Sequence, residues 1–185
     1  MALNMALKMT TARSSRQRGM SLIELMIAIL VLTVGIAGCA IVIPIAIGRN
    51  YANRQQGNST VMAQMVLEKI MSVPANTTTT LTITDCGGNA HTVNTAGSAG
   101  AGSGSSLLAS GAVDFSKSQV GNYSMDYTTC GTNGRQAVYD VRWNIQTPST
   151  FVKLVTVSAK LKSSTGNAAM FSLPVTISSM IGQGS

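Results

Sequence analysis

The chain has 185 residues, of which only 10% are charged and 4% are aromatic, and its formal net charge is +7. Four of the basic residues, Lys8, Arg13, Arg16 and Arg18, precede a long apolar run, so the net charge is no sign of a nucleic-acid-binding surface. The part beyond that run is too poor in aromatic residues for a large core, and its Gly, Ser and Thr content favours a modest β-rich domain with long loops.

The chain begins with a basic leader, residues 1–19, and an uncharged apolar run extends from Leu25 to Gly48. As a helix this run would be roughly 36 Å long, whereas the hydrocarbon core of a membrane is about 30 Å thick. We therefore expect residues 20–48 to span a membrane. The basic leader predicts a cytoplasmic N-terminus, with the rest of the chain on the other side. Glu24 is a carboxylate just inside the apolar segment, and such residues usually mark function.

Three kinds of N-terminal signal combine a basic leader with an apolar run. An ordinary secretory signal has a shorter apolar region, and no convincing cleavage site follows this one. The sequence Ile36-Ala37-Gly38-Cys39 resembles a lipobox, in which Cys39 would be acylated and the chain would be a lipid-anchored periplasmic binding protein. Two features oppose that interpretation: the residues after Cys39 stay apolar instead of forming a polar tether, and Glu24 would lie within the discarded region.

The third kind of signal accounts for Glu24. The sequence Gly19-Met20-Ser21-Leu22-Ile23-Glu24-Leu25 closely resembles the type IV prepilin signal, a basic leader ending in glycine and followed by a hydrophobic residue and Ser/Thr-Leu-Ile-Glu-Leu. Met20 stands where that family most often has phenylalanine. The resemblance implies that a membrane-embedded prepilin peptidase cuts between Gly19 and Met20 and N-methylates Met20. The apolar helix then stays on the protein.

The same resemblance implies an assembly role for Glu24. The helix dipole favours a carboxylate near a helix N-terminus by about 0.3–1 kcal/mol. This is less than the few kcal/mol that a charge in hydrocarbon costs, so a cationic partner is needed. In pilins the implied partner is the N-terminal amine of a neighbouring subunit, and the pair sets the axial register. The alternative is a carboxylate that reaches the lipid headgroups without a specific partner.

Pro44 lies inside the apolar run. It removes one helical hydrogen bond, so we expect a kink or local melting near residues 40–43. The resemblance to pilins implies a loosened helix in this part, and a simple kink of a membrane helix is the alternative.

Residues 49–73 are predicted to continue the helix in amphipathic form. Apolar residues recur there at helical spacing, at Met62, Met65, Val66, Ile70 and Val73. We expect the two methionines to be core residues. Pro74 predicts the end of the helix, because the residue before a proline is disfavoured in the α conformation.

Residues 74–121 are predicted to be rich in loops, with one short strand at 81–84. Gly87–Ala112 has a Gly/Ser/Ala low-complexity composition, which predicts a flexible surface excursion. His91, the only histidine, is expected to be solvent-exposed in this segment. Cys86 and Cys130 are the two cysteines beyond the apolar run, and the predicted orientation places them in an oxidising compartment. We therefore expect a disulfide between them, with two free thiols as the alternative.

Residues 122–185 form the clearest β-region. Alternation of apolar and polar residues predicts strands at 139–145, 151–161 and 171–177, with a further strand at 123–128. A turn is expected at 147–150. Pro174 cannot donate to a ladder, so the last strand is predicted to lie at an edge. The result is an antiparallel meander whose apolar face packs on the helix stripe.

No catalytic pattern is present in the sequence, which has no G-x-S-x-G, Walker loop, C-x-x-C or metal-spaced His/Cys set. We therefore expect no enzyme, no metal and no cofactor. The candidates for a basic patch are Lys153, Lys160 and Lys162 together with Arg135 and Arg142. No aromatic residues are interleaved with them, so a solvated sheet face is favoured and nucleic acid is not an expected partner.

These features predict an α+β, pilin-like fold, in which a long N-terminal helix, transmembrane in its first half, packs on a C-terminal antiparallel β-sheet. The phrase Ala63-Gln64-…-Leu67-Glu68-Lys69-Ile70 is similar to minor pilins and minor pseudopilins. The expected function is that of a minor type IV pilin in a pilus or its tip complex, or of a minor pseudopilin in a type II secretion system. The expected partners are prepilin peptidase, other pilin or pseudopilin subunits, an inner-membrane assembly platform and membrane lipid. The expected location is the bacterial inner membrane, followed by a periplasm-spanning filament or a pilus at the cell surface.

Overall fold

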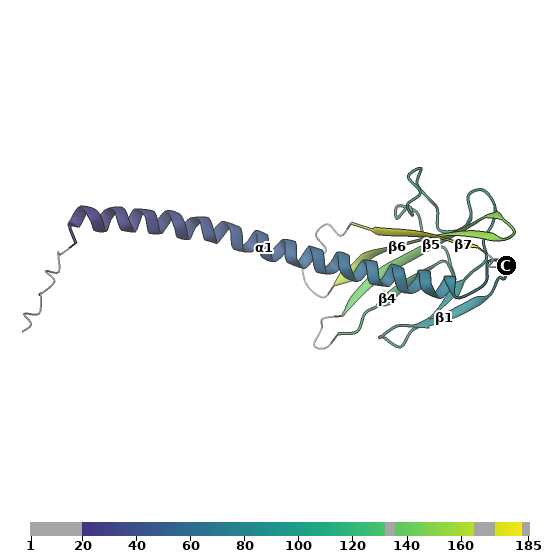
Figure 1. Ribbon diagram of the computed structural model, residues 1–185. Helices are drawn as coiled ribbons and strands as arrows, with labels where there is room; N and C mark the ends of the chain where they lie inside the picture. The colour runs from purple at the N-terminus through teal and green to yellow at the C-terminus, as the bar shows by residue number, and fades with distance from the viewer. Residues whose placement is uncertain (1–19, 132–135, 165–172, 183–185) are drawn as a thin grey trace, which may run out of the picture. The chain divides into compact units, whose positions relative to one another are not determined.

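The computed structural model describes residues 20–131, 136–164 and 173–182, which leaves the leader 1–19 with Gly19 outside the described residues. The chain comprises two compact units, residues 1–46 and residues 47–185. Helix α1, Leu22–Met71, provides the described part of the first unit apart from Met20 and Ser21, and it continues into the second (Figure 1).

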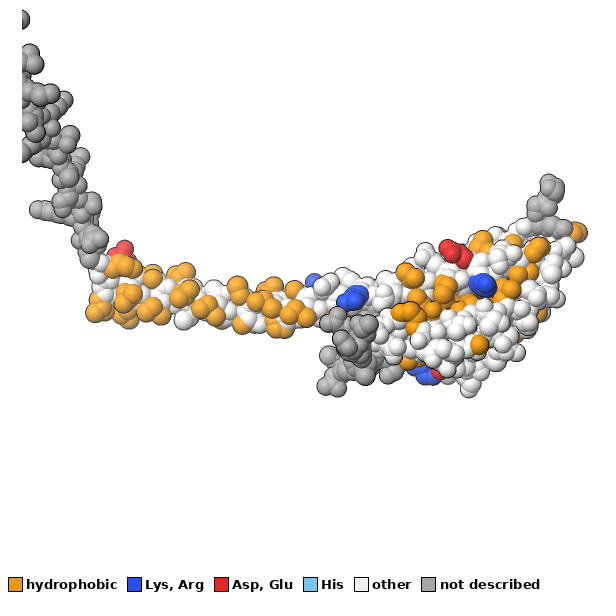
Figure 2. Space-filling model, turned by 90° about the horizontal axis from the view of Figure 1, so that it is seen from below, with side chains coloured by type: hydrophobic (Ala, Val, Ile, Leu, Met, Phe, Trp, Pro, Cys, Tyr) orange, Lys and Arg blue, Asp and Glu red, His pale blue; other side chains and the backbone are white. Residues whose placement is uncertain are grey.

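The first part of α1 is apolar on all sides. Its side chains are exposed, and Figure 2 shows hydrophobic side chains along it. In the part of the chain that the structure describes, α1 is the one helix long and apolar enough to cross a membrane. A helix that is hydrophobic all round requires an apolar environment, which is either lipid or other protein.

The last part of α1 is amphipathic and packs against the sheet. Ser59, Ala63, Val66 and Ile70 are buried at helical spacing, and Met62 and Met65 are partly buried against the same core. The helix ends at Met71, shortly before Pro74. The predicted stripe, the core position of both methionines and the helix end are confirmed.

In the described ranges the main sheet is antiparallel and has five strands: β3 Ser103–Gly104, β4 Ser124–Thr128, β5 Ala137–Ser149, β6 Val152–Ser164 and β7 Val175–Gly182. Strand β5 pairs with β6 along one side and with β3 and β4 along the other, and β7 follows β6. In the register, Trp143 faces Val157, which in turn faces Ile177. The expected α+β arrangement of a long N-terminal helix packed on a C-terminal antiparallel sheet is confirmed.

Two boundaries differ from the predicted ones. Strand β5 continues to Ser149, so the turn is shorter than expected and consists of Thr150 and Phe151. Strand β7 is the last in the strand order, as expected, but it begins at Val175, immediately after Pro174. The predicted start of this strand at Phe171 lies outside the described residues.

A second, two-stranded sheet was only half expected. Strand β1, Thr80–Thr84, pairs with β2, Ala90–Asn94, and the buried side chains of Ile83 and Val93 join the core. The expectation of one strand followed by a surface excursion was therefore wrong. The segment after β2 lies directly on β5, with hydrogen bonds from Ser98 N to Ile145 O and from Ser105 N to Trp143 O.

Glycine makes this close approach possible. Gly104 has a φ of 109°, and a Cβ atom there would lie 2.5 Å from the carbonyl oxygen of Trp143. Only glycine tolerates both the positive φ and the short separation. The low-complexity composition therefore reflects tight packing of backbone on a strand.

The two faces of the main sheet are covered differently. On one face, Tyr139, Val141, Trp143 and Ile145 form the core with the helix stripe and the β1–β2 sheet. On the other face the segment 101–119 covers polar residues of β5. Asn144 Nδ2 donates to Ala101 O and Ser105 O, and Arg142 Nη1 donates to Lys117 O.

Candidate functional site: the N-terminal assembly segment

The start of α1 is fixed by Ser21. The carbonyl oxygen of Ser21 accepts hydrogen bonds from Glu24 N at 3.0 Å and Leu25 N at 3.2 Å, and its Oγ accepts from Glu24 N at 3.3 Å. Ser21 is thus the N-cap of the helix, and the Ser-x-x-Glu spacing is that of a capping box. The cap was not recognised in the sequence, although this spacing was the signal for it.

Glu24 lies in the first turn of α1 and is exposed. No salt bridge joins it to any cation among residues 20–131, 136–164 and 173–182. The helix dipole favours a carboxylate here. In lipid or in a helix bundle, however, its charge needs a cation from outside the described part of the chain.

The residues around Glu24 form an extended apolar surface. Leu22 is 77% exposed and Leu25 is 50% exposed, and the apolar residues that follow up to Ile47 are similarly exposed. Thr33, the hydroxyl residue within this run, satisfies its Oγ1 by donating to Leu30 O at 2.8 Å. The segment therefore offers an apolar surface with a single charge at its start, which suits packing against lipid or against other apolar helices.

Pro44 and Cys39 both lie within continuous helix. Pro44 lies inside α1, and residues 40–43 before it are helical. The kink or local melting that we expect near these residues stays a prediction. Cys39 is an exposed free cysteine on the same helix.

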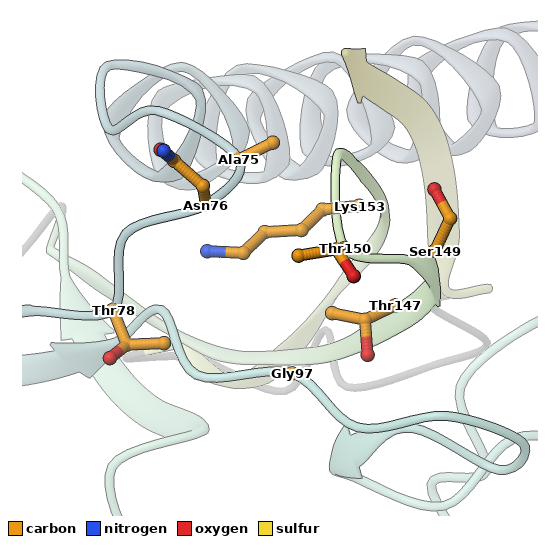
Figure 3. Close-up of a pocket in the computed structure, with 8 residues that line it drawn as sticks. All are labelled: Ala75, Asn76, Thr78, Gly97, Thr147, Ser149, Thr150 and Lys153. Atoms are coloured by element: carbon orange, nitrogen blue, oxygen red, sulfur yellow. The ribbon is translucent and has the colours of Figure 1, made fainter. Parts of the chain in front are cut away.

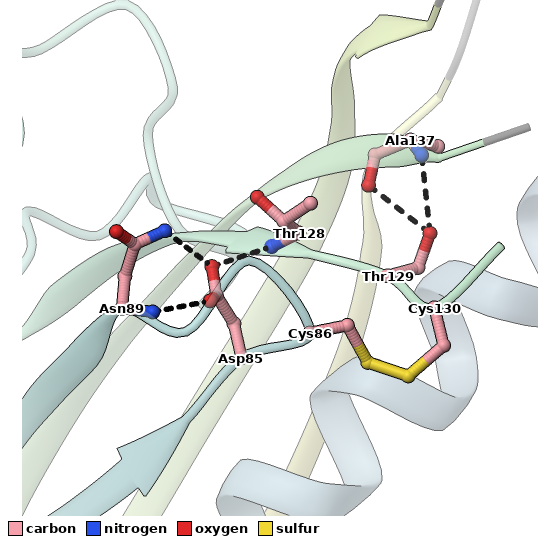
Figure 4. The surroundings of a disulfide bond; sticks show 7 residues. All are labelled: Asp85, Cys86, Asn89, Thr128, Thr129, Cys130 and Ala137. Atoms are coloured by element: carbon pink, nitrogen blue, oxygen red, sulfur yellow. Dashed lines mark hydrogen bonds between the residues drawn. A yellow bond between two sulfur atoms is a disulfide. The ribbon is translucent and has the colours of Figure 1, made fainter. Parts of the chain in front are cut away.

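A second group of predicted residues lies in the unit of residues 47–185. Cys86 and Cys130 form a disulfide with a Cα–Cα distance of 5.0 Å, as expected (Figure 4). The bond joins the β1–β2 turn to the segment that follows β4, and Cys86 N also donates to Thr128 O at 3.1 Å. The covalent link and the backbone hydrogen bond thus connect the two sheets at one place.

Asp85, next to the disulfide, was missed in the sequence. Its carboxylate is buried and accepts hydrogen bonds from Asn89 N at 2.7 Å, Asn89 Nδ2 at 3.1 Å and Thr128 N at 3.2 Å. Burial on its own raises the pKa of Asp85, but these hydrogen bonds outweigh it and hold the pKa well below the ordinary 3.8. The signal for this site was the turn sequence Asp85-Cys86-Gly87-Gly88-Asn89, because Asp side chains commonly bond to nearby backbone in turns.

His91 is not fully exposed, contrary to expectation. It lies in β2, its side chain is 18% exposed, and its Nε2 is 3.4 Å from Asp85 Oδ2. The β1–β2 pairing returns the chain to the turn, and this brings the two residues together. A loop would have left His91 in solvent.

The described members of the candidate basic patch do not share one solvated face, contrary to expectation. Lys153 is buried, Arg142 is buried in an ion pair with Asp140, and Lys162 pairs with Asp126. Lys160 is partly exposed, and Arg135 lies outside the described residues. Among residues 20–131, 136–164 and 173–182, no group of three or more His, Cys, Asp or Glu side chains is placed to hold a metal ion.

Comparison with known proteins identifies the N-terminal segment. Residues 14–40 match the prokaryotic N-terminal methylation motif, the signal of type IV pilins and pseudopilins. The matched segment includes Gly19, Met20 and Glu24 and extends into the apolar part of α1. No curated protein and no solved structure matches the chain.

Proposed function

We propose that this chain, which carries the type IV pilin and pseudopilin signal, is a minor type IV pilin. It is a structural, non-catalytic subunit that is processed at its N-terminus, held in the inner membrane by α1, and assembled into a pilus or its tip complex. One observation carries the proposal: the methylation motif continues without interruption into a capped apolar helix that has a single carboxylate in its first turn.

Processing takes place between Gly19 and Met20. Met20 is 65% exposed and lies two residues before Leu22, the first residue of α1, so the N-terminus created by the cut lies outside the regular helix. Gly19 has no Cβ, which lets the backbone approach a protease cleft closely. Prepilin peptidase cuts this bond and N-methylates the new amine of Met20.

Assembly then uses Glu24 and the apolar helix surface together. The cut creates a cationic amine at Met20, about one helical turn from Glu24. Glu24 of one subunit pairs with this amine on a neighbouring subunit, which removes two isolated charges from an apolar environment and sets the axial register. The apolar side chains from Leu22 to Ile47 pack against those of other subunits.

The choice of a minor pilin is supported by the similarity of residues 63–70 to minor pilins and minor pseudopilins. A minor pseudopilin of a type II secretion system uses the same signal and the same helix packing, and it is our second candidate. The location follows the same scheme: a single-pass inner-membrane protein with its N-terminus inside, and then a filament built on an inner-membrane assembly platform.

The proposal is tested by the intact mass of the protein extracted from membranes. We expect loss of residues 1–19 and gain of one methyl group. Gly19→Val should leave the leader attached because the added side chain blocks close approach of the backbone, and Cys39→Ser should be processed like the wild type. Loss of residues 1–38 with a diacylglyceryl group on Cys39 would instead identify a lipid-anchored protein.

A deletion strain separates the two pilin-type candidates. A minor pilin is expected to be needed for pilus-dependent behaviour such as twitching, with protein release into the medium unchanged. Loss of exoprotein release with normal twitching would favour the pseudopilin. If the wild-type chain restores the lost activity and Gly19→Val does not, the activity depends on processing of the leader.

A further inference from the structure

An open pocket of about 420 Å³, called the cavity below, lies between the chain that follows α1 and the β5–β6 turn (Figure 3). Its lining comes from three separate segments: the chain that follows α1, the chain that follows β2, and the β5–β6 turn with the start of β6. The polar side chains that line it are Asn76, Thr78, Thr147, Ser149, Thr150 and Lys153. The lining residues include no acidic and no aromatic side chain, so the lining suits neither a cation nor a ligand that stacks on aromatic rings.

Lys153 supplies the charge of this cavity. Only 3% of the residue is exposed, and Figure 3 shows its side chain lying across the cavity with the ammonium toward the segment of Asn76 and Thr78. Its Nζ donates to Thr77 O at 2.6 Å and to Thr95 O at 3.1 Å. An ammonium has three N–H groups, so these two carbonyls leave one available.

No carboxylate in the described residues balances this cation. The three ion pairs there involve His91, Arg142 and Lys162. A buried charge without a counter-charge is costly, and burial accordingly lowers the pKa of Lys153. An anion at the free N–H would remove this cost.

The surroundings of Lys153 indicate the class of anion. A single ammonium is a point charge that matches one negative charge, as on a carboxylate, and no arginine is among the lining residues to add a bidentate fork for a more highly charged group. The other polar residues of the lining, Asn76, Thr78, Thr147, Ser149 and Thr150, are uncharged, and amide and hydroxyl groups of this kind can donate to carboxylate oxygens. The volume is within the range of small-molecule sites and far above that of one water molecule, so the carboxylate is carried on a larger group.

We propose that this cavity binds a carboxylate carried on a small organic molecule or at the C-terminal end of a peptide, with Lys153 as its charge partner. The site is independent of the N-terminal signal. A failed test of this site would therefore leave the proposed function unaffected.

The test compares two probes of nearly the same shape, N-acetylglycine and N-acetylglycinamide, by calorimetric titration of the full chain in detergent. We expect the carboxylate to bind at least tenfold more tightly than the amide. Lys153→Met should remove this difference, because the apolar stem is kept and the charge is lost. Lys160→Met is the matched control, since Lys160 lies on the same strand with the opposite alternation, and the difference should remain.

A second variant tests the site without disturbing the buried lysine. Thr150 is exposed, and no hydrogen bond of its side chain is present within the described residues, so Thr150→Val should fold normally. It is expected to weaken N-acetylglycine binding several-fold. The proposal is overturned if the two probes bind equally, if neither binds, if inorganic phosphate alone binds, or if a folded Lys153→Met still prefers the carboxylate. If Lys153→Met does not fold, the comparison of the two probes on the wild type and the effect of Thr150→Val test the proposal instead.

Discussion

The hydroxyl group of Tyr139 in β5 donates a hydrogen bond to Oε1 of Gln55 in α1, across 84 positions of the chain. The Tyr139 side chain is fully buried, and Gln55 is half-buried at the rim of the helix–sheet contact. Burial raises the pKa of the Tyr139 hydroxyl, so it stays protonated and remains a donor at neutral pH. This bond adds a directional contact to an interface whose helix side is otherwise mainly apolar, with Ala63, Val66 and Ile70 buried at its centre.

Tyr139→Phe should therefore lower the free energy of unfolding by about 0.5–1.5 kcal/mol, the usual net value of one hydrogen bond. Tyr127→Phe is the matched control. Tyr127 is also buried in the core, but no hydrogen bond of its hydroxyl is present within the described residues, so the loss should be smaller. Denaturant unfolding of the full chain in detergent measures both. Equal losses in the two variants would show that the bond to Gln55 contributes nothing.

Two ion pairs on the opposite face of the sheet should differ strongly in their effect on stability. Asp126 and Asp140 face each other in the β4–β5 register, and Gln119 Nε2 donates to both carboxylates at 2.9 Å. Asp140 is held by Arg142, with side chains 12% and 8% exposed, whereas Asp126 pairs with Lys162 at 37% and 49% exposure.

Arg142→Met should cost about 3–5 kcal/mol, because it leaves a buried carboxylate without its cation opposite a second carboxylate. Lys162→Met should cost about 1 kcal/mol or less, since water screens the exposed pair. Thermal melts of the two variants make the comparison. If Lys162→Met were as unstable as Arg142→Met, the buried pair would not contribute more to stability than the exposed pair, and the prediction would be wrong.

Loss of the disulfide should destabilise the unit of residues 47–185. Cys86 and Cys130 are 44 positions apart. The chain-entropy model gives about 4 kcal/mol for a loop of this length, as an upper value. Cys86→Ser combined with Cys130→Ser should lower the melting temperature, and reductant should do the same to the wild type. Cys39→Ser should leave the melting temperature and its response to reductant unchanged, because Cys39 is a free cysteine on the apolar helix.

The carboxylate of Asp85 should make stability depend on acid. Its pKa is lower in the folded chain than its ordinary value of 3.8, so it contributes stability above that pH. This contribution is lost as the pH falls below about 4 toward the pKa of the folded state. Asp85→Asn should cost about 1–3 kcal/mol at pH 7, because the charge that accepts several hydrogen bonds is removed.

The measurement is denaturant unfolding of the wild type and Asp85→Asn between pH 7 and pH 2. The difference between them should shrink as the pH is lowered. A difference that stays constant down to pH 2 would mean that Asp85 is not ionised in the folded chain.

Glu24→Gln should separate processing from assembly. The leader cut depends on the bond at Gly19, so the intact mass should still show loss of residues 1–19. Filament assembly should fall at least tenfold, because a neutral amide does not balance the amine of a neighbouring subunit. Glu68→Gln is the matched control, as an exposed glutamate on the same helix. Normal assembly of Glu24→Gln would remove the register role from this residue.

Local periodicity accounts for most of the fold that was predicted correctly. The spacing of Met62, Val66 and Ile70 identified the buried side of the helix, and the alternation from Tyr139 to Ile145 identified β5. These patterns depend on neighbours within the same element, and a single sequence contains them in full.

The features that were missed depend on contacts between distant segments. The packing of the glycine-rich segment on β5 requires Trp143, far along the chain from Gly104, and composition alone does not reveal that partner. Lys153 is a different case. It shares the alternation of Val155 and Val157, both of which are buried, so the sequence pattern predicts that it lies on the core side of β6. We instead expected Lys153 to be solvated because it is charged.

The cap at Ser21 has a consequence for maturation. Within residues 20–131, 136–164 and 173–182, its carbonyl oxygen and hydroxyl group accept from Glu24 and Leu25, which lie on the retained side of the proposed cut after Gly19. Removal of the leader would then leave the geometry of the helix start unchanged. What changes is charge: a neutral peptide nitrogen at Met20 becomes a cation about one turn from Glu24. Cleavage would thus act as an electrostatic switch on a helix that is already complete.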